Sequence, residues 1–242
     1  MTQDRGMLSF VVPAHDEEAS IDAVVRAIAT AATGTSHEIV VVDDASTDRT
    51  AELARRAGAT VVSIDRRQIA AARNAGAQQA TGDVLVFVDA DTLVDAAVVA
   101  GLCRAIDEGA VGGGAAIRFD EPVPRWVTWI LPVASWIGRR MRVTGGCFVF
   151  CRRVDFEAIG GFDETLFAAE EIALCRAMAR RGRVAILRES VLTSGRKLRT
   201  YTGRELLAVC LHVAFAGRAG LRDRSRLGVW YDARRPDRRG PS

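Results

Sequence analysis

Histidine, cysteine and long apolar segments are all scarce in this chain, and each scarcity narrows what the protein can be. Among 242 residues there are three histidines and five cysteines, and the cysteines are not closely paired. The Cys-x-x-x-Cys spacing of Cys147 and Cys151 would put both on one face of a strand, but no second Cys or His pair follows. We therefore expect buried free thiols, as in a reducing compartment, rather than a zinc site.

The apolar runs are too short to cross a membrane. The longest, at 126–138 and 206–217, fall below the roughly 20 residues that a spanning helix needs, and no apolar leader precedes the first expected strand. The formal net charge of +3 is too small to indicate a nucleic-acid partner. We therefore expect a cytoplasmic protein that does not bind nucleic acid.

In the first half of the chain, short apolar runs alternate with segments whose apolar residues recur with the period of a helix. This alternation predicts an α/β fold with a Rossmann-like, mostly parallel sheet flanked by helices. Ser20 and Ser46 are the expected N-caps of the first two helices. The expected strands are 8–13, 38–44, 60–64 and 84–88, and the expected helices are 20–32, 47–57 and 69–80.

The second half is less regular but shows no repeat and no linker. We expect one continuous domain over 1–200, followed by an arginine-rich, helical extension at 201–242. The expected helices of the second half are 95–108, 154–164 and 169–182, and the expected strands are 110–119, 143–153 and 184–188.

Acidic residues follow three of the expected strands. Ligands of a parallel sheet gather at the carboxyl ends of its strands, so these acids are expected to share one edge. Two neighbouring carboxylates repel each other unless a cation lies between them. The pair Asp89 and Asp91 therefore indicates either a divalent metal or an ordinary acidic turn. The three clusters are Asp16, Glu17 and Glu18; Asp43 and Asp44; and Asp89 and Asp91.

Seven short segments follow one another along the chain: "VVPAHDEE", "VVDDASTDRT", "AAARNAGAQQATGD", "FVDADT", "GGCFVFCRR", "GGFDE" and "AEEIALCRAMARRG". In this order and spacing they resemble the family 2 glycosyltransferases with the GT-A fold. The resemblance covers roughly residues 7 to 200 and implies a nucleotide-sugar half at about 7–92 and an acceptor half at about 93–200.

The resemblance implies a nucleotide-sugar donor, with UDP favoured, and Mg²⁺ or Mn²⁺ as cofactor. Carboxylate oxygens would hold the ion, which would neutralise the departing diphosphate. Asp43 or Asp44 would accept a hydrogen bond from the base. Asp91 would bind the metal, and Asp89 the ribose or the metal. The other residues implied around the nucleotide are Pro13, His15, Glu17, Gln68 and Arg73.

On the acceptor side the resemblance implies a carboxylate base, because a hydroxyl is a weak nucleophile. Glu171 occupies the base position, and transfer would proceed with inversion. Glu170 and the small turn Gly145–Gly146 would lie beside the acceptor, and Arg196 and Lys197 would contact the diphosphate. Simpler roles are open for each: acids favour a helix N-terminus, glycines form turns, and basic loops are often just solvated.

Other functions fit parts of the pattern. A nucleotide-sugar-binding protein without transfer activity is one, and a nucleotidyltransferase is another, although "PAHDEEAS" offers acids where that class has a glycine-rich basic loop. A Rossmann dehydrogenase ranks last, because no Gly-x-Gly-x-x-Gly follows the first strand.

Tryptophan and arginine are concentrated around 125–142. Trp126, Trp129 and Trp136 flank an apolar stretch bounded by arginines, which suits either peripheral membrane contact with a lipid-linked acceptor or a core or dimer helix.

Overall fold

A computed structural model describes residues 6–120, 123, 129, 140, 145–200 and 221–222. The predicted alternation is confirmed over the first half. Its strands are β1 (Leu8–Ala14), β2 (His37–Asp44), β3 (Thr60–Ile64), β4 (Val84–Val88) and β5 (Thr92–Leu93), and its helices are α1 (Ile21–Ala31), α2 (Thr50–Arg56), α3 (Ile69–Gln79) and α4 (Ala96–Asp107). The second half holds the strands β6 (Gly112–Phe119), β7 (Phe148–Arg152) and β8 (Val184–Thr193) and the helices α6 (Arg153–Ile159), α7 (Glu170–Arg181) and α8 (Arg196–Thr200).

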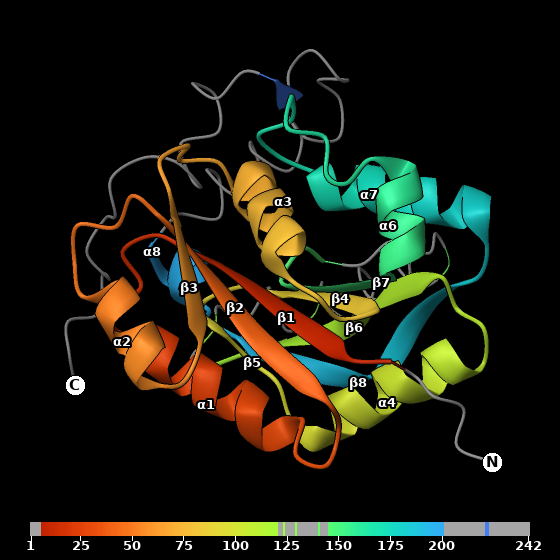
Figure 1. Ribbon diagram of the computed structural model, residues 1–242, viewed down its shortest axis with the longest axis horizontal. Helices are drawn as coiled ribbons and strands as arrows, with labels where there is room; N and C mark the ends of the chain where they lie inside the picture. Colours follow the sequence, from red (N-terminus) through yellow and green to blue (C-terminus); the bar gives the residue numbers. More distant parts are fainter. Residues whose placement is uncertain are drawn as a thin grey trace.

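The strands form one sheet between two layers of helices (Figure 1). Among the described residues the strand order is β3-β2-β1-β4-β7-β6-β8-β5. β3, β2, β1 and β4 are parallel, as expected, and so are β6 and β8. β7 runs antiparallel to β4 and β6, and β5 runs antiparallel to β8. The sequence could not show these reversals, because a strand buried on both faces is apolar in either direction.

Each face of the sheet has its own apolar core. Phe10 and Val12 of β1 point to the side covered by α1, α2 and α4, whereas Val11 points to the side covered by α3, α6 and α7 (Figure 1). The five residues of β4 alternate between the two cores and are all buried. Burial on both sides fixes the position of β4 and therefore of the acids that follow it.

The cysteines are buried and free, as expected, at the four described positions. The prediction that Cys147 and Cys151 share one face is wrong, because they belong to the two different cores. β7 begins only at Phe148, so Cys147 lies in the preceding turn and does not follow the alternation of the strand.

Three local predictions need correction. α2 begins at Thr50 rather than at 47, and Ser46 does not cap it but accepts the Asp16 N–H at 3.0 Å. Ser20 occupies the N-cap position of α1, but its hydroxyl donates to Glu17 instead of accepting from the helix. The segment 193–201, read as a basic loop, contains the short helix α8. The Ser46 hydroxyl is engaged by the loop after β1, and the Ser20 hydroxyl by Glu17 three residues earlier in its own loop.

Most of the tryptophan-rich stretch, including Trp126 and Trp136, lies outside the described residues. Trp129 is 79% exposed, and Arg140 is exposed. No helix in the described part of the chain is long and apolar enough to span a bilayer. The extension at 201–242 is described only at 221–222, where the Leu221 carbonyl accepts the Phe167 N–H at 2.9 Å. The proposed domain boundary at 200 stays a prediction.

Candidate active site

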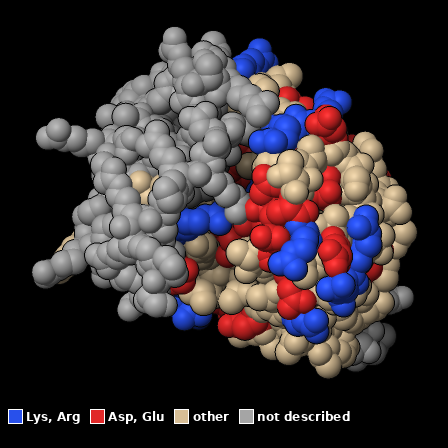
Figure 2. All heavy atoms as spheres, turned by 90° about the vertical axis from the view of Figure 1, so that its left-hand side faces the viewer, with Lys and Arg blue, Asp and Glu red and all other residues tan. Residues whose placement is uncertain are grey.

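Acidic side chains gather on the face of the molecule toward which β1 and its parallel neighbours run (Figures 1 and 2). The loops after β1, β2 and β4 meet at this edge, because the three strands are adjacent and aligned in register. The arrangement follows the general rule for ligand sites of parallel sheets.

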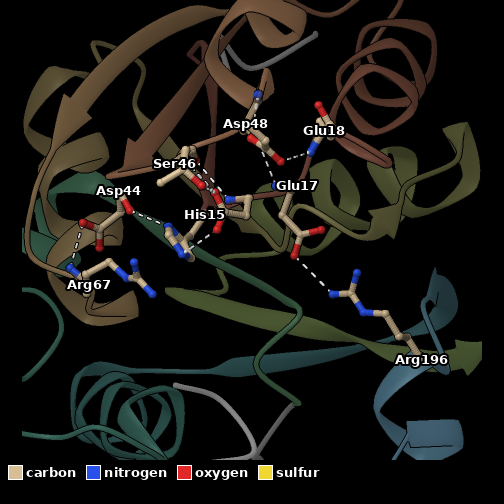
Figure 3. Close-up of polar contacts among 11 residues, drawn as sticks. His15, Glu17, Glu18, Asp44, Ser46, Asp48, Arg67 and Arg196 are labelled. Atoms are coloured by element: carbon tan, nitrogen blue, oxygen red, sulfur yellow. Dashed lines mark hydrogen bonds and ion pairs between the residues drawn. The ribbon is translucent and has the colours of Figure 1, made fainter. Parts of the chain in front are cut away.

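The loops after β1 and β2 are joined to each other by side-chain to backbone hydrogen bonds (Figure 3). Asp16 has a left-handed backbone conformation, with φ of 49°, which lets its N–H and its carboxylate face the second loop together. The carboxylates of Asp16 and Asp48 therefore stabilise the structure of the two loops. The bonds run from Asp16 N–H to Ser46 Oγ (3.0 Å), from Thr47 N–H to Asp16 Oδ1 (2.7 Å), from Glu17 N–H to Thr50 Oγ1 (2.7 Å) and from Glu18 N–H to Asp48 Oδ2 (3.1 Å).

His15 and Glu17 lie on the same loop but face different neighbours. The His15 Nδ1 lies 2.8 Å from the Asp44 carbonyl oxygen, and its Nε2 lies 3.1 Å from Asp16 Oδ2. Glu17 accepts from Ser20 Oγ at 3.0 Å and pairs with Arg196 at 3.3 Å (Figure 3). Glu17 thus connects the first strand end with α8, 179 positions later. Pro13 lies within β1, opposite Val42.

Asp43 and Asp44 have opposite surroundings although they are adjacent. The Asp44 carboxylate accepts the backbone N–H groups of Arg66, Arg67 and Gln68 at 2.7 to 2.8 Å, which orders the loop before α3. Asp43 Oδ1 is buried and has no hydrogen-bond partner within the described structure. A buried acceptor without a donor is unfavourable, so Asp43 is the carboxylate with capacity for a ligand N–H.

Arg73 lies at the centre of the site and is 2% exposed. Its guanidinium pairs with Asp89 and with Glu170, each at 2.9 Å, and donates to the Gly146 carbonyl at 2.8 Å. Burial alone would lower the pKa of Arg73, but Asp89, Glu170 and Glu171 outweigh it and raise that pKa above the usual arginine value. Arg73 therefore stays charged and supplies part of the positive charge that the sequence assigned to a metal.

Glu171 lies half-buried in the first turn of α7. Its Cδ lies 3.2 Å from the place where a Cβ on Gly146 would be, so a side chain at position 146 would press on this carboxylate. Burial and the neighbouring Glu170 raise the pKa of Glu171 to about 8, although Arg73 opposes them. A carboxyl group that titrates near neutral pH and borders a small-residue turn is typical of an acid–base residue.

Asp89 and Asp91 differ in their partners. Asp89 Oδ1 pairs with Arg73, whereas Asp91 Oδ1 lies 3.4 Å from the Thr193 hydroxyl, which in turn bonds Thr92 at 2.9 Å. No cluster of three or more acidic, His or Cys ligands suited to a metal occurs in the described ranges. This donor set nonetheless fits Mg²⁺ or Mn²⁺, because such ions keep several waters and bind through one or two carboxylates plus substrate phosphates.

The remaining expected residues are placed as follows. Arg196 begins α8 and pairs with Glu17, while the side chain of Lys197 lies outside the described residues. A Cβ on Gly145 would lie 2.3 Å from Ile117 Cδ1, so a side chain there would require Ile117 to shift. The Gln68 amide faces the carbonyls of Glu164 and Leu166.

Asn74 was missed by the sequence analysis. Its side chain bonds the backbone of Phe162 and the carboxylate of Glu164. A signal existed, because asparagine is a poor residue for a helix interior and often marks a specific side-chain bond.

Known proteins share this sequence pattern and this fold. An undecaprenyl-phosphate 4-deoxy-4-formamido-L-arabinose transferase of Pseudomonas aeruginosa is 34% identical over 139 residues, which are 53% of this chain and 41% of that protein. A dolichol-phosphate mannosyltransferase of Pyrococcus furiosus is 35% identical over 107 residues, or 42% and 30% of the two chains. This chain thus spans less than half the length of the curated relatives it matches.

Solved structures show the likeness of fold. The mannosyltransferase PcManGT from Pyrobaculum calidifontis, in complex with GDP-Man and Mn²⁺, superposes with a TM-score of 0.68 at 20% identity, covering 90% of this chain and 65% of that one. Glucosyl-3-phosphoglycerate synthase from Mycobacterium tuberculosis, with Mn²⁺ and UDP, gives 0.60 at 22% identity, covering 90% and 81%. The predicted GT-A fold is confirmed.

The sequence profile described as glycosyl transferase family 2 matches residues 9–160. The match includes β1 to β4, the acidic loops that follow them, and the turn at Gly145–Gly146. Because it spans more than half of the sequence, the chain belongs to glycosyl transferase family 2.

Proposed function

We propose that the protein transfers a sugar from a nucleotide-diphosphate sugar to an acceptor oxygen held above Gly145 and Gly146. The observation that carries the proposal is that the acidic residues of the site have different surroundings. Asp43 keeps a buried oxygen without a partner in the described structure. Asp91, just after β4, lies beside the Thr193 hydroxyl, and Glu171 borders the glycine turn.

On the donor side, Asp43 would accept an N–H of the base, and uracil N3–H and guanine N1–H both have the required donor. The mannosyltransferase structure contains GDP-Man and the synthase structure contains UDP, so the fold accommodates both nucleotides. We favour UDP for this chain. His15 and Glu17 would lie beside the nucleoside, and Arg196 would turn from Glu17 to the diphosphate.

Asp91, and Asp89 through the oxygen that Arg73 leaves, would hold a divalent cation together with the diphosphate. When bound, Mg²⁺ or Mn²⁺ would neutralise negative charge on the leaving group. The protein itself supplies the positive charge of Arg73, which pairs with Asp89 at 2.9 Å.

In the transfer step, an acceptor oxygen attacks the anomeric carbon as the bond from that carbon to the phosphate oxygen breaks. The bonding electrons leave with the nucleoside diphosphate, and the configuration inverts. With a hydroxyl acceptor, the proton passes to Glu171, which must be ionised to take it.

The acceptor class decides how much Glu171 contributes. Two relatives carry undecaprenyl-phosphate and dolichol-phosphate in their names. A phosphate monoester has a second pKa of about 6, so its oxygen is already anionic at neutral pH and needs no base. The raised pKa of Glu171 favours this second candidate, because a protonated Glu171 would not repel an anionic acceptor.

The first test is calorimetric titration of the protein with UDP and with GDP, each with and without Mn²⁺. We expect metal-dependent binding of one nucleotide, abolished by Asp91→Ala and weakened at least tenfold by Asp43→Asn. Asp22→Asn, an exposed change in α1, serves as the control. Failure of both nucleotides to bind would contradict the proposal.

The second test measures transfer by wild type and Glu171→Gln with a hydroxyl acceptor and with a prenyl phosphate. A loss of about 100-fold or more indicates a hydroxyl acceptor and a base. A loss below about threefold with the prenyl phosphate indicates that class instead. Nucleotide binding without transfer to any acceptor would favour a binding protein.

Peripheral membrane contact is part of the proposal, since a lipid-linked acceptor must be reached. The exposed Trp129 and the exposed Arg140 support it, as this pair of residue types suits a membrane interface. We expect binding to anionic liposomes at low salt, reduced by Trp129→Ala. A wild-type protein that does not sediment with the liposomes would contradict this part.

A further inference from the structure

Helix α3 reaches from the nucleotide side of the site to the segment that leads into α7. Asn74 accepts the Phe162 N–H at 2.9 Å and donates to the Phe162 carbonyl at 3.0 Å and to Glu164 Oε1 at 2.9 Å. The side chain thus pairs with both backbone groups of Phe162, as a neighbouring strand would. Such a pair of hydrogen bonds fixes the position of the Phe162 backbone along α3 as well as its distance from the helix.

The neighbouring residues of α3 hold the same segment at other points. Arg73 lies 5.2 Å from the centre of the Phe162 ring and pairs with Glu170 at 2.9 Å. Gln68, the N-cap residue directly before α3, donates to the carbonyls of Glu164 and Leu166. The chain from 162 to 170 is therefore attached to α3 at its beginning, middle and end.

The backbone at both ends of this segment has unusual conformations. Gly161 has φ of +78°, and a Cβ there would lie 2.7 Å from Asn74 Oδ1, so only glycine allows the side chain of Asn74 to approach. Ala169, directly before α7, has φ of 61°, a left-handed conformation that is unfavourable for alanine. Such a conformation persists only where the surrounding contacts impose it.

We propose that Asn74 is a positioning residue for catalysis, which acts by holding the 162–170 segment so that Glu171 faces the Gly146 turn. The inference rests on the proposed function with Glu171 as the acting residue. The described hydrogen bonds of Asn74 go to Phe162 and Glu164, neither of which is assigned to the nucleotide, so Asn74 acts on turnover rather than on donor affinity.

The experiment is a double-mutant cycle of Asn74→Ala and Glu171→Gln. The readouts are calorimetric affinity for UDP or GDP with Mn²⁺, and hydrolysis of the corresponding sugar nucleotide, in which water replaces the acceptor hydroxyl. Gln78→Ala is the matched control, because Gln78 is an exposed amide on the same helix.

We expect Asn74→Ala to lower turnover about tenfold or more and to leave the nucleotide Kd within about twofold. In the Glu171→Gln background the same change should have no further effect, because the group it positions is already gone. An equal loss in both backgrounds, or a loss confined to nucleotide affinity, would overturn the inference.

If Asn74→Ala does not fold, Asn74→Asp replaces it in the cycle. Aspartate keeps the acceptor for the Phe162 N–H but turns an oxygen toward the Phe162 carbonyl and the Glu164 carboxylate, so a loss of similar size with the same coupling to Glu171 is expected. Wild-type protein that binds neither nucleotide contradicts the proposed function itself. Intact binding without coupling contradicts only the role of Asn74.

Discussion

The acids after β1 and β2 and the acids of the acceptor side are held in different ways. On the donor side, Asp16 and Asp44 accept backbone N–H groups of the two neighbouring loops. On the acceptor side, Glu170 has a buried arginine as its partner, and that arginine lies 97 positions earlier in the chain. Asp89, at the end of β4, shares this partner.

The difference separates carboxylates that build the site from carboxylates that remain available. Backbone N–H groups saturate Asp44 and leave the adjacent Asp43 with a buried oxygen that has no partner in the described structure. Arg73 neutralises Asp89 and Glu170, and the carboxyl group of Glu171 keeps a raised pKa beside them. The acceptor side therefore depends on one residue far more than the donor side does.

Loss of Arg73 should have the largest effect on stability, because the acceptor side depends on this one buried residue and the donor side does not. Arg73→Met leaves Glu170 buried and unpaired, and we expect a loss of about 3–5 kcal/mol in the free energy of unfolding. Urea denaturation measures it. Arg26→Met, which breaks an exposed ion pair in α1, is the control and should produce no measurable change. Equal stabilities of the two variants would show that Arg73 is not the centre of the site.

The pH dependence of turnover tests whether Glu171 acts in the free enzyme with the raised pKa. For a hydroxyl acceptor, kcat/KM should rise about tenfold per pH unit below 8 and level off above it, because only the ionised carboxylate accepts a proton. Steady-state rates measured from about pH 5.5 to about pH 9 give the profile. A flat profile in wild type would contradict a base role for this residue.

Replacing Asp43 and Asp44, the last two residues of β2, one at a time tests the donor-side half of the comparison. Asp44→Asn places an amide against backbone donors and should cost about 1–3 kcal/mol of stability. Asp43→Asn is isosteric and should leave stability unchanged, while nucleotide affinity falls about tenfold to a hundredfold. Thermal unfolding and calorimetry of both variants decide it. The reverse assignment would follow if Asp43→Asn proved the less stable variant.

The bridge between Glu17 and Arg196 tests whether the two regions communicate through α8. Arg196→Ala should weaken diphosphate binding about tenfold, since a charge-assisted hydrogen bond contributes about 1.5 kcal/mol. Stability should hardly change, because the pair is partly exposed. Titration with UDP and with uridine separates the diphosphate contribution. An equal loss for both ligands would place Arg196 away from the diphosphate.

The last prediction concerns the pH dependence of stability. The folded-state pKa of Glu171, about 8, lies above its unfolded value near 4.5. The folded protein therefore binds the extra proton between these two values, and stability falls as pH rises through this window. Glu171→Gln should remove this slope and give a Tm clearly above that of wild type at about pH 9. Parallel Tm curves of wild type and Glu171→Gln from about pH 5 to about pH 9 would show that folding does not raise the pKa of Glu171.

Much of this could be predicted from the sequence. The alternation of apolar strands and helices over the first half determined the α/β class, and the acids after three strands determined the edge where the site lies. The order of seven short segments determined the family. These features are local: they depend on residues within one strand, one helix or one turn.

Only the tertiary structure decided which of these residues serve the ligand. Asp43 and Asp44 look alike in sequence, and their roles separate only when the loop at 66–68 folds against one of them. Arg73 and Asn74 show no sign in sequence that they contact Glu170 and Phe162, because those contacts join residues almost a hundred positions apart. The chain determined the charges and the elements, whereas packing of distant elements decided which charges are neutralised, because ion pairs and buried hydrogen bonds depend on position in space.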